Sequence, residues 1–353
     1  MDVPASTTDT EAPAPTTGMW TQPAALAQWL ARHTDCVTPP VAVDRVGIGQ
    51  SNITTIVTDA AAREWVMREP PPGDTATKAH DVLREAHILS ALANTDVPVP
   101  RVIGTGESPT GSPFLVMDRV PGSPLESEDD ARTLTASQRR ALGVSVAEAL
   151  GRLHRIDPSA LGVAASSSPY LVRQMRRISA AWDHVRAVSR HDGNWEAVRA
   201  GLTQQLPQPS PAVVMHGDYR LSNLLIADGH ITAVLDWELC TIGDPFADLA
   251  WLLDDWRPSE EPAIVMPTPT RAGGFPNRDE MVEVYRAVTG FRIDDLDYYR
   301  AFSQWRAASL LEGVRARRRA GSMGSHAAID LDELEDSIGV LLASASSHLA
   351  RMK

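Results

Sequence analysis

The sequence contains little cysteine and no long hydrophobic run. Cys36 and Cys240 are the two cysteines among 353 residues, too few for a disulfide framework or a cysteine-based zinc site. No apolar stretch approaches the roughly 20 residues that a membrane-spanning helix needs. Residues 1–18 lack the basic and apolar regions of a signal peptide, and their Pro, Thr and Ala content predicts a disordered tail. We therefore expect a cytoplasmic protein with no membrane partner.

An excess of positive charge is also missing. The 33 Lys and Arg residues are outnumbered by 45 Asp and Glu residues, which gives a net charge of −12. No nucleic-acid partner is expected for such a chain. The same charge suits a cationic substrate, although many acidic proteins bind no cation. The length allows one large or two ordinary domains, and a hydrophobic content of 43% is enough for a sizeable core.

The residue pattern changes near residue 121. Before it, alternating residues in 41–69 and 97–120 predict a small mixed sheet of about five strands, with a helix at 77–93. After it, helical patterns dominate and frame one predicted hairpin. The chain is therefore expected to be an α+β protein with a tail at 1–18, a small β-rich N-terminal lobe at 19–120 and a larger helical C-terminal lobe at 121–353. Helices are expected at 22–33, 135–156, 170–189, 194–205, 244–255, 277–290, 296–319 and 327–351.

The stretch HGDYRLSNLLIADGHITAVLDWE, residues 216–238, is the most informative. Asn223 follows Asp218 by five residues, and Asp236 follows Asn223 by 13. One interpretation is turn chemistry, because Asp and Asn favour turns and Asp228-Gly229 suits a two-residue hairpin turn. The other is the H-R-D-x-x-x-x-N and D-F-G pattern of kinases. There, one carboxylate faces an acceptor hydroxyl, while a second carboxylate and an amide oxygen hold Mg²⁺ against phosphates.

A glycine-rich loop between the first two predicted strands strengthens the kinase interpretation. Backbone N–H groups of Gly47, Gly49, Ser51 and Asn52 would cover the phosphates of a nucleotide. Taken alone, the same residues would be an ordinary turn.

Two further places fit a nucleotide site. Arg68 ends the third predicted strand, where kinases have a lysine, and Glu85 lies 17 residues later in the predicted helix. The two would form an ion pair, which without this context would be a surface pair. Met117, Asp118 and Val120 occupy the connector between the lobes, where backbone groups would hold adenine.

At these motifs the chain resembles the superfamily of aminoglycoside phosphotransferases and choline kinases, which have a bilobal protein-kinase-like fold. HGDYRLSNLLI, VLDWELCTIGDPFADLAWLL, QSNITTIV and VMREPPPG resemble the branch of phosphotransferase domains associated with acyl-CoA dehydrogenases, over roughly residues 22–350. The resemblance implies transfer of phosphate from ATP, or from GTP, to a hydroxyl of a small molecule with Mg²⁺. It implies that Asp218 is the catalytic base, that Asn223 and Asp236 bind Mg²⁺, and that Asp244 and Asp248 are structural.

The departures from the kinase pattern reduce the range of possible substrates. Trp237-Glu238 replaces the Phe-Gly of D-F-G, and only eight residues separate Asp236 from Asp244, with no A-P-E stretch. This leaves no room for a long activation segment, so no protein substrate is expected. Aminoglycoside-like, choline-like, sugar and hydroxyacyl acceptors all stay open, as do ATP against GTP and the oligomeric state. The alternative is a nucleotide-binding pseudokinase-type module without transfer; metal-dependent hydrolysis lacks a cluster of His ligands.

Other candidates have a structural interpretation beside a functional one. His216 is expected to brace the backbone rather than act as base or ligand, and His154 to end a helix or pack in the core. The basic run at 315–319 is expected to be a helix end closed by Gly321, with an anionic substrate tail as the alternative. We expect the acceptor site to be lined by residues 170–205 and 256–276.

Overall fold

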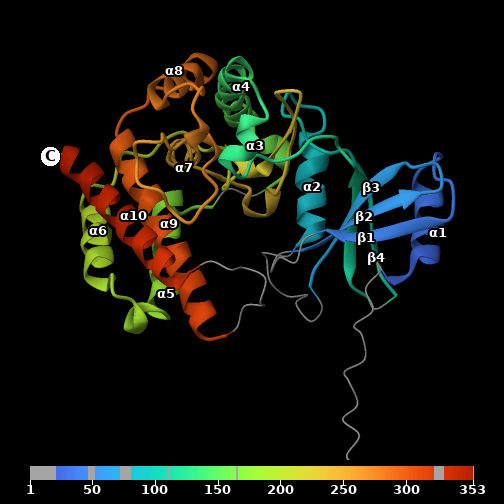
Figure 1. The fold of residues 1–353 in the computed structure, drawn as a ribbon, viewed down its shortest axis with the longest axis horizontal. Coiled ribbons are helices and arrows are strands. Elements are labelled where there is room, and N and C mark those ends of the chain that lie inside the picture. The colour runs from blue at the N-terminus through green and yellow to red at the C-terminus, as the bar shows by residue number, and fades with distance from the viewer. Residues whose placement is uncertain are drawn as a thin grey trace, which may run out of the picture. The chain divides into compact units, whose positions relative to one another are not determined.

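A computed structural model describes residues 21–46, 52–71, 81–109, 111–163, 166–321 and 330–352 (Figure 1). The chain divides into two compact units, one of residues 1–83 and 103–118 and one of residues 84–102 and 119–353. In the described ranges, no helix is long and apolar enough to cross a membrane.

The first unit is built on a five-stranded sheet with the order β1-β2-β3-β5-β4. Its five strands match the number that the sequence predicts. The pairs β1–β2, β2–β3 and β3–β5 are all antiparallel, so the expected mixture of parallel and antiparallel pairs is not found among these three. Every second residue of β2 is buried, as the alternating sequence predicts. Trp29 and Leu30 of α1 pack with Trp65, Met67 and Phe114 of the sheet in one core. The elements are α1 (Pro23–His33), β1 (Val41–Val46), β2 (Ile53–Asp59), β3 (Glu64–Glu69), β4 (Val102–Glu107) and β5 (Pro113–Asp118).

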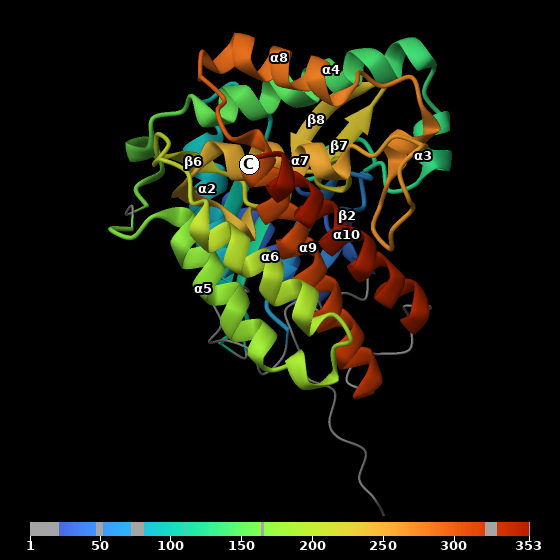
Figure 2. The same ribbon diagram turned by 90° about the vertical axis from the view of Figure 1, so that its left-hand side faces the viewer.

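The second unit is mainly helical (Figure 2). Long helices α9 and α10 lie side by side, and α8 lies along α4. Trp182 and Trp195 stack with ring centroids 4.6 Å apart, and Trp195 meets Trp305 at 4.8 Å, which ties α5, α6 and α9 together. The helices are α2 (Val82–Leu92), α3 (Glu128–Arg132), α4 (Ala136–His154), α5 (Tyr170–Asp183), α6 (Asp192–Gln204), α7 (Pro245–Asp255), α8 (Arg278–Thr289), α9 (Leu296–Arg319) and α10 (Leu331–Arg351).

Helix α2 groups with the helical unit, although the sequence-based division placed it in the N-terminal lobe. The reason lies in its polar side chains. Arg84 donates hydrogen bonds to the carbonyl oxygens of Glu238, at 3.1 Å, and of Cys240. The His87 ring is hydrogen-bonded to the Leu161 carbonyl at 2.7 Å. These contacts tie α2 to segments that lie far along the chain, which the sequence alone does not reveal.

Several helix ends follow their sequence signals. Asn277 and Glu280 form the expected capping box of α8, and Gly290 ends that helix with φ of 70°. The basic run also ends a helix, because α9 stops at Arg319 and Gly321 has φ of 66°. Arg315 is the exception, since it is buried and pairs with Glu312 at 2.7 Å.

Two short two-stranded sheets carry the 216–238 stretch. β6 (Val213–Met215) pairs with β9 (Thr241–Gly243), and β7 (Leu224–Ala227) pairs with β8 (His230–Val234). Asp228 and Gly229 both have positive φ, 51° and 78°, which confirms the two-residue turn. At the other end of this hairpin, the Leu235 N–H donates to the Asn223 carbonyl at 2.8 Å. Asn223 and Asp236 therefore lie at the same end of the hairpin.

Candidate active site

The loop from residue 216 to 223, here called the motif loop, is anchored by Asp248 of α7. The two oxygens of this buried carboxylate accept the backbone N–H groups of His216, at 2.7 Å, and Gly217, at 2.9 Å. Burial by itself would raise the pKa of Asp248, but hydrogen bonding and charge from His154 together with the His216 contacts lower it. Asp244 caps α7 through the Phe246 N–H. Both aspartates thus have the structural roles expected of them.

His216 braces the motif loop from inside. Its Nδ1 accepts the Asp218 N–H at 3.2 Å, which assigns the ring proton to Nε2, and Nε2 lies 2.8 Å from the Leu235 carbonyl. The ring is buried, so it bridges the two arms of the motif rather than facing a ligand. Gly217 has φ of 88°, and a Cβ there would lie 2.7 Å from the Leu239 carbonyl oxygen, so no other residue fits.

Asp218 is half-buried and held by two donors. Its Oδ1 accepts the indole N–H of Trp251 at 2.6 Å, and its Oδ2 accepts the Asn223 side-chain amide at 3.0 Å. A carboxylate oxygen can accept two hydrogen bonds, so each oxygen keeps capacity for a proton from a bound hydroxyl. The arrangement fixes the orientation of Asp218.

Trp251 and Arg306 are site residues that the sequence did not indicate. The Arg306 guanidinium lies 4.3 Å from the centre of the Trp251 ring and donates to the Gly217 carbonyl at 2.7 Å. Stacking on the ring and bonding to the motif loop hold the indole where it reaches Asp218. Trp251 lies in the apolar run DLAWLL, where a core tryptophan would look the same, and Arg306 is 89 residues from Gly217.

The oxygens of Asn223 and Asp236 fit a magnesium ion. The Asn223 side-chain nitrogen donates hydrogen bonds to the Asp218 carbonyl and carboxylate, which leaves the Asn223 Oδ1 to bind a metal ion. Oδ1 of Asp236 is buried, and the part of the chain that the structure describes offers it no hydrogen-bond partner. Hard oxygen donors of this kind suit Mg²⁺, which takes its remaining ligands from phosphate and water. No group of three or more His, Cys, Asp or Glu suited to a metal occurs among the described residues.

The residues expected to bind the nucleotide are described only in part. Gly47, Gly49 and Ser51 lie outside the described residues. Asn52 is buried before β2, and its Oδ1 has no hydrogen-bond partner within the described ranges. Its expected contact with phosphate stays a prediction.

The remaining nucleotide residues are spread over both units. Arg68 lies on β3 opposite Leu115 of β5, whereas Glu85 is buried on α2 in the other unit. Their pairing stays a prediction, as does adenine binding by Met117, Asp118 and Val120, of which the first two end β5.

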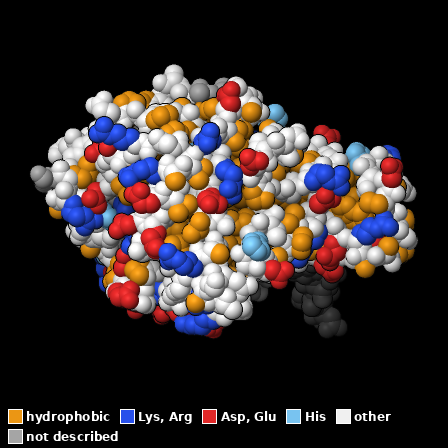
Figure 3. All heavy atoms as spheres, turned by 90° about the horizontal axis from the view of Figure 1, so that it is seen from above, with side chains coloured by type: hydrophobic (Ala, Val, Ile, Leu, Met, Phe, Trp, Pro, Cys, Tyr) orange, Lys and Arg blue, Asp and Glu red, His pale blue; other side chains and the backbone are white. Residues whose placement is uncertain are grey.

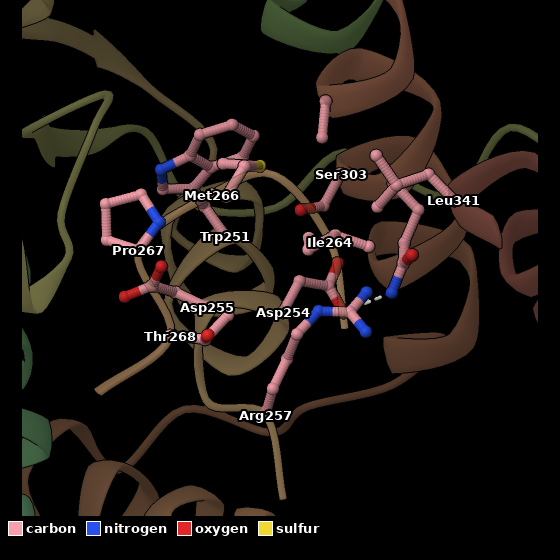
Figure 4. Close-up of a pocket in the computed structure, with 12 residues that line it drawn as sticks. Trp251, Asp254, Asp255, Arg257, Ile264, Met266, Pro267, Thr268, Ser303 and Leu341 are labelled. Carbon is pink, nitrogen blue, oxygen red and sulfur yellow. Dashed lines mark hydrogen bonds between the residues drawn. The ribbon is translucent and has the colours of Figure 1, made fainter. Parts of the chain in front are cut away.

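A pocket in the helical unit adjoins Asp218 through Trp251 (Figure 4). The segment 256–276 contributes to it, whereas Tyr170, Leu171 and Arg173 line a different pocket with Asp244. The expectation that 170–205 and 256–276 line the acceptor site stays a prediction. Polar side chains from α7, from the following loop and from α9 surround the pocket beside apolar ones. Its lining includes Trp251, Asp254, Asp255, Arg257, Ile264, Met266, Ser303, Gln304 and Leu341.

Cys240, close to the motif, takes no part in this chemistry. The thiol is buried, and burial raises its pKa to about 12. A thiol with such a pKa stays protonated and unreactive at neutral pH, as the sequence led us to expect.

Comparison with known proteins identifies the family. The model of the "Phosphotransferase enzyme family" matches residues 42–284. The chain belongs to this phosphotransferase family. Acyl-CoA dehydrogenase family member 10 of Mus musculus is 32% identical over 314 residues, which are 86% of this chain and 29% of the relative. Family member 11 of Homo sapiens is 28% identical, over 78% of this chain and 36% of the relative. The chain thus spans about a third of the length of these relatives.

Solved structures confirm the protein-kinase-like fold of this phosphotransferase. A Ralstonia eutropha protein, provisionally assigned as an aminoglycoside phosphotransferase, superposes with a TM-score of 0.75 at 27% identity, covering 92% of this chain and 98% of that one. An aminoglycoside phosphotransferase APH(4)-Ia in complex with AMP-PNP and hygromycin B gives a TM-score of 0.60 at 17% identity, over 92% and 99%. The expected fold class, α+β with a β-rich and a helical lobe, is therefore confirmed, and so is the resemblance to the domains of acyl-CoA dehydrogenase relatives.

Proposed function

We propose that the protein transfers the terminal phosphate of ATP to a hydroxyl group of a small molecule in a magnesium-dependent reaction. The observation that carries the proposal is the Asp218 carboxylate, held by Trp251 and Asn223 beside the oxygens of Asn223 and Asp236. A nucleotide-binding module without transfer would not need an oriented carboxylate at this place, so the enzyme is favoured over the pseudokinase alternative.

The residues of the motif have separate roles in the proposed reaction. Asp218 accepts the proton of the acceptor hydroxyl as the hydroxyl oxygen attacks the terminal phosphorus, and the bond from that phosphorus to the bridging oxygen breaks, so that ADP leaves. Trp251 and Asn223 keep the carboxylate in one orientation, which lowers the entropy cost of reaching the reactive geometry. Mg²⁺ held by Asn223 and Asp236 would neutralise negative charge on the phosphates.

The nucleotide and the acceptor are proposed by analogy with the family. Solved neighbours are complexes with AMP-PNP and hygromycin B, or with GDP, so both ATP and GTP belong in the test. A viomycin phosphotransferase of Streptomyces vinaceus is 31% identical over 47% of this chain, which supports a small-molecule acceptor. We propose that the acceptor lies against Trp251, because its indole N–H contacts the Asp218 carboxylate at 2.6 Å.

Thermal unfolding and product release test the proposal. MgATP or MgGTP should raise the melting temperature, because a ligand that binds only the folded state stabilises it by mass action. ADP or GDP release should then appear with at least one member of a panel of hydroxylated metabolites, sugars, choline and aminoglycosides. No thermal shift with either nucleotide, with and without Mg²⁺, contradicts nucleotide binding altogether. A shift without any release supports the pseudokinase alternative.

A further inference from the structure

Arg306 of α9 lies beside the proposed base and has a charge that no carboxylate neutralises. Its guanidinium donates a hydrogen bond to the Gly217 carbonyl at 2.7 Å and lies 4.3 Å from the centre of the Trp251 ring. Among the described residues it forms no ion pair and no other hydrogen bond. A guanidinium has five N–H donors and no acceptor, so most of the donors of Arg306 remain available to a ligand.

Other arginines of α9 are neutralised inside the protein. Arg300 pairs with Asp254 at 2.8 Å, and Arg315 pairs with Glu312 at 2.7 Å. Figure 3 shows a similar arrangement on one face of the molecule, where Lys and Arg side chains lie next to Asp and Glu side chains. The positions one turn before and one turn after Arg306 hold no acidic residue, so the helix itself supplies no partner.

The unbonded nitrogens of Arg306 are accessible. The side chain is half-buried, and none of its nitrogens belongs to the fully buried side-chain atoms that lack a partner within the described ranges. Its Nε and its second terminal nitrogen therefore reach the surface. A ligand can contact these atoms without any rearrangement of the protein.

The position of Arg306 relative to Asp218 assigns it to the acceptor rather than to the nucleotide. Oδ2 of Asp218 accepts from the Asn223 amide at 3.0 Å, on the side of the proposed Mg²⁺ and phosphates. Oδ1 accepts from the Trp251 indole at 2.6 Å, and Arg306 stacks on that indole. The carboxylate and the guanidinium are thus one indole apart, on the side where the acceptor is proposed to lie.

Helix α5, which packs against α9, adds positive charge. Burial raises the pKa of Tyr170, its first residue, to about 12; the charges of Arg306 and Arg173 oppose this rise, whereas Asp248 and Asp244 add to it. Both of these carboxylates are buried and accept hydrogen bonds from the protein itself. The one acidic residue of α5 is its last. The helix carries three arginines that form no ion pair within the described ranges: Arg173, Arg176 and Arg177.

We propose that the acceptor carries an anionic group, a carboxylate or a phosphate, and that Arg306 binds this group while Asp218 holds the hydroxyl that is phosphorylated. A guanidinium makes charge-assisted hydrogen bonds to either anion, and these are about twice as strong as neutral ones. The inference rests on the proposed phosphotransfer. It deepens that proposal by giving the acceptor class: a hydroxy acid or a hydroxylated phosphate ester, not a cation such as choline or an aminoglycoside.

The first test compares probes of one carbon skeleton and different charge. With MgAMP-PNP bound, affinities are measured by calorimetry for D-glycerate, glycerol 3-phosphate, glycerol and 2-amino-1,3-propanediol, and for D-gluconate, glucose 6-phosphate, D-glucose and D-glucosamine. In at least one series an anion should bind roughly 10–100-fold more tightly than the neutral probe. The carboxylate and phosphate members show which anion is preferred. Binding of neutral or amine probes as tight as that of the anions, or no binding of any anion, would overturn the inference.

The second test uses charge variants of α9. Arg306→Gln removes the charge, so it should weaken binding of the preferred anion by roughly 10–100-fold and leave the neutral probe unchanged, whereas Arg306→Lys should keep part of the preference. Arg317→Gln removes the same charge from an exposed position of the helix and should keep the full preference. If Arg306 only braces the motif loop, Arg306→Gln will weaken anionic and neutral probes alike, which contradicts the proposal.

Failure of this inference can be told apart from failure of the proposed function. Release of ADP with a neutral or cationic acceptor, and not with an anionic one, would support phosphotransfer and overturn the anionic acceptor. The thermal shift with MgAMP-PNP alone reports on the nucleotide site. No response to the nucleotide would contradict the proposed function itself.

Discussion

Asp248 and Asp255 are two buried carboxylates of α7, seven residues apart, whose surroundings shift their pKa values in opposite directions. Both oxygens of Asp248 accept backbone N–H groups of the motif loop, and its contacts lower its pKa. Asp255 pairs with Arg220 through one oxygen at 2.7 Å, and burial raises its pKa to about 6 although Arg220 acts to lower it. The comparison separates a carboxylate whose contacts in the folded protein favour its charge from one whose burial opposes it.

The largest effect should come from Asp218 in the motif loop. Asp218→Asn removes the proposed base, so kcat should fall on the order of 10²–10⁴-fold while nucleotide binding persists. Asp236→Ala should instead weaken the magnesium-dependent part of ATP binding as well as turnover. Calorimetric titration of MgATP and a turnover assay on both variants measure the difference.

Both variants should stay folded, because neither carboxylate anchors the backbone as Asp248 does. If the two variants behave identically, or if Asp218→Asn keeps full turnover, the hairpin carboxylates only stabilise turns and have no catalytic role.

Asp248→Ala should have the largest effect on stability. It leaves two buried backbone N–H groups without acceptors, so the free energy of unfolding should fall by about 2–5 kcal/mol. Chemical denaturation measures the loss, with Asp279→Ala, an exposed carboxylate of α8, as control. Because the pKa of Asp248 is lowered on folding, its contribution is present above the unfolded pKa of about 3.9 and is lost as the pH falls through the folded value. If Asp248→Ala lowers the free energy of unfolding no more than Asp279→Ala does, the motif loop keeps its conformation without Asp248.

Trp251→Phe should reduce kcat by roughly tenfold, because it removes one hydrogen bond to a charged group. The affinity for MgATP should not change, which distinguishes positioning of Asp218 from a general structural defect. Trp305→Phe is the matched control, because the buried Trp305 indole N–H has no hydrogen-bond partner among the described residues. Steady-state kinetics of the two variants should differ in kcat. Equal losses would mean that ring volume matters rather than the N–H.

The smallest effect concerns the pH dependence of the pocket. Because burial raises the pKa of Asp255 to about 6, protonation favours the folded state. The associated stability is fully present below the unfolded pKa of about 3.9 and is lost as the pH rises through about 6. The melting temperature of the wild type should therefore decline more between pH 5 and pH 7 than that of Asp255→Asn. Parallel curves would show that Arg220 keeps Asp255 charged throughout.

The sequence by itself determined what depends on neighbouring residues. The capping box and terminal glycine of α8 appear where Asn277, Glu280 and Gly290 predict them, and α9 spans the predicted range. The turn at Asp228-Gly229 also follows from the sequence, because glycine and aspartate tolerate positive φ. The motif spacing pointed to the family for the same reason, since a hairpin of fixed length sets the separation of Asn223 and Asp236.

Only the tertiary structure decided what lies around these elements. Asp218 meets Trp251 across 33 residues of sequence, and Gly217 meets Arg306 across 89, so no local pattern marks either partner. A tryptophan in an apolar helix has the same sequence appearance whether it fills the core or orients a carboxylate. The pocket beside Trp251 depends on the same physics: whether Asp255 or Ser303 has a partner is settled by which side chains packing brings within about 3 Å of it.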